Sequence, residues 1–368
     1  MNLTLLIPFL GVTCFAGPIY TLTDLGTLGG PTAMATGLND HGQTVGTMVD
    51  PAGYMHAFSS ALPLTSAANE AEAAGINKEG QVAGTQFVNQ VGYATVWTNG
   101  VPATLGGAGS YALAINSSGD VAGMLVNSGQ GNAFVTQNGT VVDLGAFDGG
   151  SWSSAYALND QGQAAGYGMI SNGVFRGFIW TPGQGYLALG TLGGFNSYAM
   201  AINNEGQVAG SSQISSGYSH AFVSDGTTMT DLGTLGGVAS YGYGINDAGD
   251  VVGYSWTAGN TTTDGFLEEG GVMLDINSLL IDAPGWQVTA LYGINNSNQV
   301  VGVGVLDGVE HAVLLTDPPA ATFVATPEPA AWICTIGGLA ILLLWKGVTR
   351  SASPLRVRPR GQPPAPLR

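Results

Sequence analysis

The sequence predicts an all-β protein, a seven-bladed β-propeller, and two observations carry most of that prediction. First, one pattern recurs along the chain: a small residue precedes Ile or Leu and Asn, and a short turn then leads into Gly-Gln/Asp-Val-x-Gly. Successive copies are about 43 residues apart on average, which is the length of a four-stranded propeller blade. Second, Gly supplies 59 of 368 residues without a triplet period, among alternating Val, Ile, Phe and Tyr, as in short strands joined by tight turns. The repeated asparagines are Asn39, Asn77, Asn116, Asn159, Asn203, Asn246 and Asn295.

One repeat, residues 197–237, shows how four strands fill the period. Residues 197–203 suit a tightly packed inner strand, and the following Asn203-Asn204-Glu205-Gly206 is a turn, because Asn can bond its own backbone and Gly can take a positive φ. Residues 207–213 form the second strand, in which Gly210 allows a neighbouring backbone to approach closely. Residues 220–223 and 229–232 complete the unit as third and fourth strands.

The two ends of the repeat array predict how the ring closes. Residues 19–25 resemble a fourth strand but precede any first strand, whereas the seventh unit stops after its third strand, residues 311–315. We therefore expect the N-terminal strand to complete the last blade, which removes exposed sheet edges. An open β-solenoid is the alternative architecture.

The first and last segments carry targeting signals. Residues 1–16 form a predicted signal peptide, because their apolar run is too short for a bilayer and ends in small residues, although no Lys or Arg precedes it. The repeats occupy residues 17–318, and a linker over 319–329 contains Pro327, Glu328 and Pro329. Residues 330–345 are apolar and predict a transmembrane helix of about 24 Å.

The basic tail sets the predicted orientation of that helix. Lys346 and Arg350 follow it directly, so we expect residues 346–368 to remain cytoplasmic and the repeats to face outward. Residues 326–350, with Pro-Glu-Pro, one hydrophobic helix and a basic cluster in order, resemble a PEP-CTERM sorting signal. That resemblance implies recognition by an exosortase in the inner membrane of a Gram-negative bacterium that makes exopolysaccharide. The Pro/Arg-rich extension to Arg368 departs from it, and a permanent single-pass anchor is the alternative.

The repeats themselves resemble those of the HAF family of bacterial extracellular proteins. His-Ala-Phe occurs at residues 56–58 and 220–222, with degenerate forms elsewhere and DLGTLGG segments between units. The resemblance implies the fold and export to the cell surface or extracellular matrix. It implies no particular biochemical activity.

Charge narrows the class of partner. Residues 17–326 contain two basic residues, Lys78 and Arg176, against 23 of the 24 carboxylates, a formal charge of −21. A surface this acidic repels phosphate backbones and excludes a nucleic-acid partner. Both cysteines, Cys14 and Cys334, lie outside the repeats, which excludes disulfides and cysteine-ligated metals from the repeat body.

No residue set predicts catalysis. Three of the four histidines, His56, His220 and His311, occupy equivalent repeat positions, where a strand-end hydrogen bond explains them better than a shared metal. Asn-Asp-x-Gly turns favour a hairpin over a calcium site, so no metal and no cofactor is predicted. The alternative is a polysaccharide hydrolase or lyase whose site lies in the irregular sixth and seventh units, residues 257–286. Its candidate carboxylates are Glu268, Glu269 and Asp282.

Aromatic residues indicate carbohydrate binding. Flat rings beside Asn, Ser and Thr hold sugars, and Trp152, Trp256 and Trp286 lie off the repeat consensus, which makes them the candidate ligand contacts. Trp97 and Trp180 follow the third-strand motif and are expected to pack between blades. Together these observations predict an exported, non-catalytic binding or structural module associated with exopolysaccharide or biofilm, with its function in the variable loops.

Overall fold

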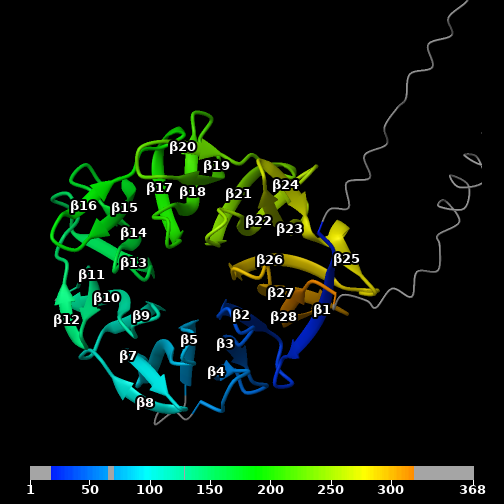
Figure 1. Cartoon of the computed structure of the whole chain (residues 1–368), viewed down its shortest axis with the longest axis horizontal. Helices are drawn as coiled ribbons and strands as arrows, with labels where there is room; N and C mark the ends of the chain where they lie inside the picture. Colours follow the sequence, from blue (N-terminus) through cyan, green and yellow to red (C-terminus); the bar gives the residue numbers. More distant parts are fainter. Residues whose placement is uncertain (1–17, 65–69, 128, 319–368) are drawn as a thin grey trace, which may run out of the picture. The chain divides into compact units, whose positions relative to one another are not determined.

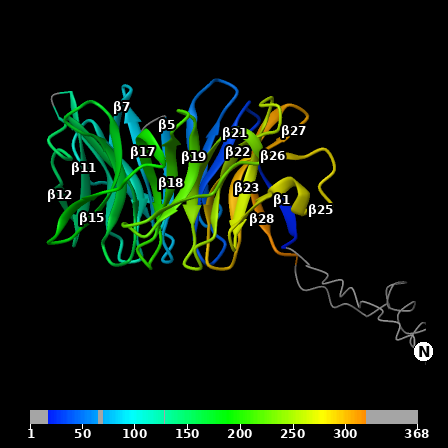
Figure 2. The same cartoon turned by 90° about the horizontal axis from the view of Figure 1, so that it is seen from above.

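The computed structural model describes residues 18–64, 70–127 and 129–318, which form a ring of antiparallel sheets (Figures 1 and 2). The predicted signal peptide, linker, sorting motif (Pro327, Glu328, Pro329), transmembrane helix and basic tail with Lys346 and Arg350 lie outside these residues. Within the described ranges, no helix has the length and apolar character needed to cross a bilayer.

The elements follow one another around the ring in chain order (Figure 1). The first half contains β1 (Tyr20–Gly26), β2 (Ala33–Leu38), β3 (Thr44–Val49), β4 (Met55–Ser59), β5 (Glu70–Ile76), β6 (Val82–Val88), β7 (Val91–Thr98), β8 (Val101–Thr104), β9 (Ser110–Ile115), β10 (Val121–Asn127), β11 (Gln130–Gln137), β12 (Thr140–Asp143), β13 (Trp152–Leu158), β14 (Ala164–Met169), β15 (Phe175–Thr181) and β16 (Gly185–Ala188). The second half contains β17 (Gly193–Ile202), β18 (Val208–Ile214), β19 (Ser219–Ser224), β20 (Met229–Asp231), β21 (Gly236–Ile245), β22 (Val251–Thr257), β23 (Thr263–Glu269), β24 (Val272–Asp275), the 3₁₀ helix η1 (Ile276–Leu279), β25 (Leu280–Ile281), β26 (Gln287–Ile294), β27 (Val300–Leu306) and β28 (Val309–Thr316).

Consecutive strands pair within each sheet, as in β5-β6-β7-β8, β17-β18-β19-β20 and β21-β22-β23-β24. The groups β9–β12 and β13–β16 join into one eight-stranded sheet through a parallel contact between Gly131 and Trp152. Sheets arranged around a common axis, each with its first strand innermost, are the architecture of a β-propeller (Figure 1). The all-β prediction is therefore confirmed for the described residues.

The repeat over residues 197–237 folds as predicted, with one difference at its start. The inner strand β17 begins at Gly193, because this glycine of the preceding connection already pairs with Ile214 of β18, and Leu192 adds a parallel bridge to the same residue. Gly206 takes φ +80° in the turn. A Cβ on Gly210 would lie 1.9 Å from the Tyr198 carbonyl oxygen, so this position requires glycine.

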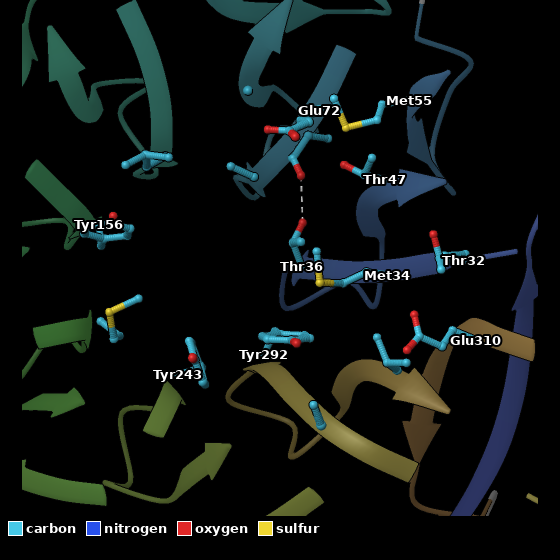
Figure 3. Close-up of a pocket in the computed structure, with 18 of the residues that line it drawn as sticks. Thr32, Met34, Thr36, Thr47, Met55, Glu72, Tyr156, Tyr243, Tyr292 and Glu310 are labelled. Carbon is cyan, nitrogen blue, oxygen red and sulfur yellow. Dashed lines mark hydrogen bonds between the residues drawn. The ribbon is translucent and has the colours of Figure 1, made fainter. Parts of the chain in front are cut away.

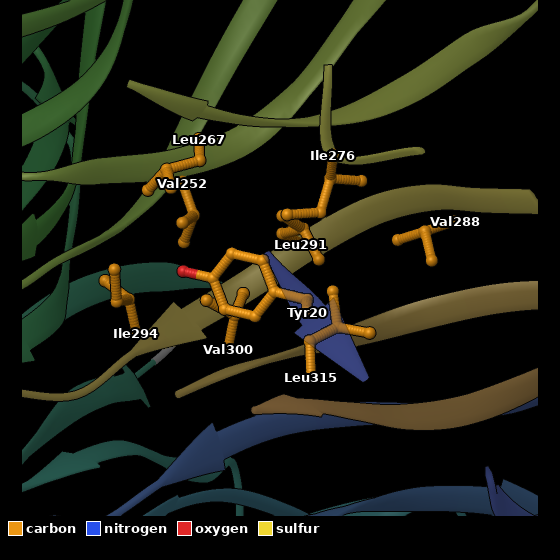
Figure 4. Packing of buried hydrophobic residues seen from close by; sticks show 9 residues of the cluster. All are labelled: Tyr20, Val252, Leu267, Ile276, Val288, Leu291, Ile294, Val300 and Leu315. Carbon is orange, nitrogen blue, oxygen red and sulfur yellow. The ribbon is translucent and has the colours of Figure 1, made fainter. Parts of the chain in front are cut away.

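The N-terminal strand closes the ring, as predicted. β1 pairs antiparallel with β28, from Thr21 opposite Thr316 to Gly26 opposite Ala312. On its other edge β1 pairs in parallel with β25, an outer strand that the sequence pattern did not predict. Tyr20 is fully buried at the centre of an apolar cluster drawn from β1, β22, β23, η1 and β26 to β28 (Figure 4).

The core consists of separate clusters between neighbouring sheets. Four phenylalanines of the His-Ala-Phe-like segments, Phe134, Phe178, Phe222 and Phe266, are 0% exposed and occupy equivalent third-strand positions, whereas Phe58 in the first unit is half-buried. Trp97 is also buried and packs against β3 and β5, which confirms its predicted structural role. The first group differs from the four-strand prediction, because residues 60–64 after β4 form no strand.

Candidate functional site

The repeated asparagines form a hydrogen-bonded belt at one end of the ring, which we call the asparagine face. In six of the seven turns the asparagine Oδ1 accepts backbone N–H bonds from two and four residues ahead; at Asn203 the donors are Glu205 (3.1 Å) and Gln207 (2.8 Å), whereas Asn246 accepts from Asp250. The Nδ2 group then donates to the backbone carbonyl of the next turn, for Asn203 to Asn246 at 2.9 Å. Each buried amide thus stabilises its own turn and fastens it to its neighbour.

The belt closes on itself. Asn295 donates to the Asn39 carbonyl at 2.9 Å, which joins residues 256 positions apart independently of β1. One link differs: Asn246 donates to Asn298 Oδ1 at 2.9 Å. Asn298 stands where other turns have Gly and takes φ +55°, so its side chain adds an acceptor that Gly lacks.

A second tier of polar groups lines the channel mouth at the asparagine face. At five of the seven anchors the following residue accepts from the preceding turn, as when Asp160 accepts from the Ser117 N–H and hydroxyl at 2.8 and 2.9 Å. The mouth encloses about 200 Å³ between these turns. Because most of these polar groups bond to one another, this face acts as a scaffold.

The opposite end of the ring, where the inner strands begin, is the open face, and it contains the larger cavity. Inner-strand residues alternate between the sheet and the channel, and the third residue before each anchor asparagine points inward, as does the fifth in most repeats. The third residues all line the cavity: Thr36, Ala74, Leu113, Tyr156, Met200, Tyr243 and Tyr292. These positions vary between repeats, whereas the anchors beside them do not.

The variation makes the cavity asymmetric. It has a volume of about 1090 Å³ and is walled on one side by Tyr156, Tyr243 and Tyr292, and on the other by Thr36 and Glu72 (Figure 3). A large concave site with aromatic walls and a few polar groups is the usual form of a ligand pocket.

Ring contacts hold the tyrosine wall in place. Tyr243 stacks on Tyr254 with ring centroids 5.7 Å apart and meets Tyr292 edge-to-face at 5.3 Å. The Tyr156 and Tyr167 hydroxyls are 3.0 Å apart, and their rings stack. Burial raises the pKa values of Tyr243, Tyr254 and Tyr292 above their ordinary 10, so these phenols remain protonated at neutral pH and can donate hydrogen bonds.

Carboxylates supply the charge of the cavity. Half-buried Glu72 on β5 and exposed Glu310 on β28 both line it. Burial, with a smaller contribution from the charge of Glu70, raises the pKa of Glu72. Among the residues that line the cavity there is no Lys or Arg. Lys78 lies at the asparagine face, and the Arg176 guanidinium donates to the Phe175 and Phe195 carbonyls.

The three candidate tryptophans lie toward the open face in different settings. Trp256, near the end of β22, lines the central cavity beside Tyr243 and Tyr254. Trp152 begins β13 and lines a separate rim pocket of about 450 Å³, with its ring 5.3 Å from that of Tyr167. Trp286, just before β26, packs edge-to-face on His311 at 5.2 Å. The structure therefore brings only Trp256 of these three into the central cavity.

The histidines lie in strand-end pairs, in the arrangement expected from their repeat positions. His220 Nδ1 is 2.9 Å from Asp231, His311 Nδ1 is 3.0 Å from Asp24, and His56 Nε2 is 3.0 Å from Asp50. The described ranges contain no group of three or more His, Cys, Asp or Glu placed to hold a metal ion.

The three candidate carboxylates of the alternative enzyme site differ in burial and in hydrogen bonding. Glu268 is 6% exposed and accepts the Gly271 N–H at 2.6 Å, so it stabilises the β23–β24 turn. Glu269 and Asp282 are exposed, and none of the three lines the central cavity.

Sequence reasoning missed the tyrosines of the cavity. The small and apolar residues of the inner strands indicate packing elements, and the aromatic candidates for ligand contact that stand off the repeat consensus are tryptophans. The signal was nevertheless available, because the third residue before each anchor changes from Thr36 to Tyr243 while the anchor stays Asn. A constant neighbour beside a variable inward position marks a binding surface on a repeat scaffold.

No protein-family model matches the chain, and no curated protein sequence matches it. Among solved structures the chain is similar to the β-propeller domain of the Trilobed protease from Pyrococcus furiosus, at 12% identity and TM-score 0.49, over 82% of this chain and 96% of that one. It is also similar to YCF48 bound to D1 peptide, at 12% identity and TM-score 0.45, over 82% and 97%. TolB from Acinetobacter baumannii matches at 13% identity and TM-score 0.42, over 78% of this chain but only 64% of the TolB chain.

Proposed function

We propose that this chain is an exported, seven-bladed β-propeller that binds polysaccharide without chemically changing it. The seven anchor asparagines and the strand groups that precede and follow them support the blade count. The β1–β28 pair and the Asn295–Asn39 bond support closure of the ring.

Export and sorting belong to the same proposal and are supported by the sequence alone. The apolar segments at residues 1–16 and 330–345, with Pro-Glu-Pro between the repeats and the second segment, fit delivery through the inner membrane of a Gram-negative bacterium. An exosortase that recognises Pro327, Glu328 and Pro329 would then release the repeats to the cell surface or the biofilm matrix.

The single observation that carries the binding function is the asymmetric central cavity. Sugar rings present C–H groups on their faces and hydroxyls around their edges. Tyr243, Tyr292 and Trp256 offer flat apolar surface for the faces, and protonated phenols, Thr36 and the two carboxylates offer partners for the hydroxyls. Its volume of about 1090 Å³ has room for several sugar residues.

Co-sedimentation of the full chain with exopolysaccharide from the producing strain tests this function. We expect the wild-type chain to sediment with the polymer and release no soluble sugar. Trp256→Ala should weaken binding about 10-fold, because it removes an aromatic surface inside the cavity. Trp152→Ala removes the same kind of side chain from the separate rim pocket and serves as the matched control.

Three results would contradict the proposal or part of it. Loss of binding in Trp152→Ala but not in Trp256→Ala would move the site to the rim pocket. Release of oligosaccharide would show an enzyme, and substitution of Glu268, Glu269 and Asp282 would then test the alternative site. Absence of binding by the wild-type chain, with or without calcium, would reject the carbohydrate function.

A further inference from the structure

We infer that the central cavity selects a polysaccharide whose sugars have free, protonated amino groups. This inference rests on the proposed function and names the class of polymer. Its basis is the combination of carboxylates and aromatic rings in one cavity that no basic side chain lines.

Glu72 is the strongest part of the argument. It lies on β5 with the cavity in front of it and Ala73 and Thr85 buried around it, and Met55 and Thr47 are its labelled neighbours in the close-up (Figure 3). No Lys, Arg or His in the part of the chain that the structure describes forms an ion pair with it, since the described ion pairs all involve histidines elsewhere. Burial, and to a smaller extent the charge of Glu70, raises the pKa of Glu72, as expected for a carboxylate with no cationic partner.

A cationic ligand would neutralise the charge of the Glu72 carboxylate, whereas a neutral or acidic ligand would not. A protonated amine forms a charge-assisted hydrogen bond with a carboxylate, about twice as strong as a neutral one. Glu72 and Glu310 lie on either side of the β2 residues Thr32 and Met34 in Figure 3, so successive sugars of one chain could each meet a carboxylate.

The tyrosine wall favours the same ligand. The faces of tyrosine rings attract cations, and Tyr243 and Tyr292 stand across the cavity from Glu72 (Figure 3). Acetylation of the amine would remove both the charge and the cation–π attraction while leaving the sugar ring unchanged. A uronic acid polymer would place its carboxylates against Glu72 and Glu310 and should be rejected.

The test compares a glucosamine hexamer with its fully N-acetylated counterpart, by calorimetry on the full chain at several pH values from mildly acidic to neutral, because the preference requires a protonated amine and an ionised Glu72 together. We expect the free-amine hexamer to bind about 100-fold more tightly, the effect of two charge-assisted hydrogen bonds, one to each carboxylate. Glu72→Gln and Glu310→Gln should each reduce that preference by about 10-fold and leave the affinity for the acetylated hexamer unchanged.

Glu79→Gln is the matched control, because it makes the same change of charge at an exposed position on the asparagine face. Equal weakening by Glu79→Gln and Glu72→Gln would show attraction to the acidic surface as a whole and overturn the inference. Equal affinity for the two hexamers would overturn the inference and leave polysaccharide binding standing, as would binding of exopolysaccharide but of neither hexamer. Failure to bind either hexamer or the exopolysaccharide would reject the proposed function as well.

Discussion

The asparagine face and the open face are opposite ends of the same inner strands, yet they treat polar groups in opposite ways. At the asparagine face Asn203 is 4% exposed and its amide makes four hydrogen bonds. At the open face the Glu72 carboxylate lines a cavity, and no Lys, Arg or His among the described residues forms an ion pair with it. One end of each strand is committed to holding the ring together, and the other end is left available for a ligand.

The difference shows how a repeat protein can change its function without losing its fold. Anchor positions carry bonds between neighbouring turns, so a substitution there affects two units at once. The positions three residues earlier all line the cavity, and most of the positions five residues earlier do as well. Variation confined to these positions produces a tyrosine wall beside Thr36 and Ala74 on an unchanged scaffold.

The largest expected effect comes from breaking the belt. Asn203→Ala removes a buried amide and leaves the Glu205 and Gln207 N–H groups and the Asn246 carbonyl without their side-chain partner. We expect the free energy of unfolding to fall by about 3 kcal/mol, measured by denaturant titration.

The control for this change is Asn172→Ala, in an exposed turn where the side chain accepts a single N–H bond from Val174. It should change stability by no more than about 0.5 kcal/mol. A loss of similar size in both variants would show that the belt contributes no more than an ordinary turn, and the contrast between the two faces would fail.

A neighbouring pair of serines provides an intermediate effect within one strand. Ser153 Oγ is buried, accepts the Ala133 N–H at 2.9 Å and donates to the Gly145 carbonyl at 3.1 Å, which fastens β13 to the preceding group. Ser154 Oγ is equally buried and has no hydrogen-bond partner among the described residues. We expect Ser153→Ala to lower the free energy of unfolding by about 2 kcal/mol, because it leaves the buried Ala133 N–H group without an acceptor.

Ser154→Ala should be neutral or slightly stabilising, within about 0.5 kcal/mol, because it removes a buried hydroxyl that has no partner. Thermal unfolding of the two variants under the same conditions measures the difference in their stability. Equal destabilisation would mean that packing rather than hydrogen bonding sets the cost at these positions.

The sequence was most informative where a residue's role is local or repeated. The spacing of the anchors predicted the turns, and the unmatched strand at residues 19–25 predicted the β1–β28 pair, since an unpaired edge must be covered. It was least informative about η1 and β25, which are short and belong to one unit only. Which residues line the cavity depends on which face of each inner strand points toward the ring axis, and the register of the ring sets that face. The sequence does not show this register, so it does not distinguish Trp256, which lines the cavity, from Trp286, which does not.

The smallest expected effect is a pH-dependent gain in stability from Glu72→Gln. Burial holds the pKa of Glu72 in the folded chain above its ordinary value of 4.5, so ionisation opposes folding. The cost is fully present above the folded-state pKa and disappears as the pH falls to 4.5, because the folded chain then gains a proton before the unfolded chain does. Glu72→Gln should therefore raise the melting temperature at neutral pH and lose that advantage below pH 4.5, whereas Glu79→Gln should show no such change. A destabilised Glu72→Gln variant at neutral pH would mean that the carboxylate already has a stabilising partner, and the open face would then resemble the asparagine face in satisfying its own charges.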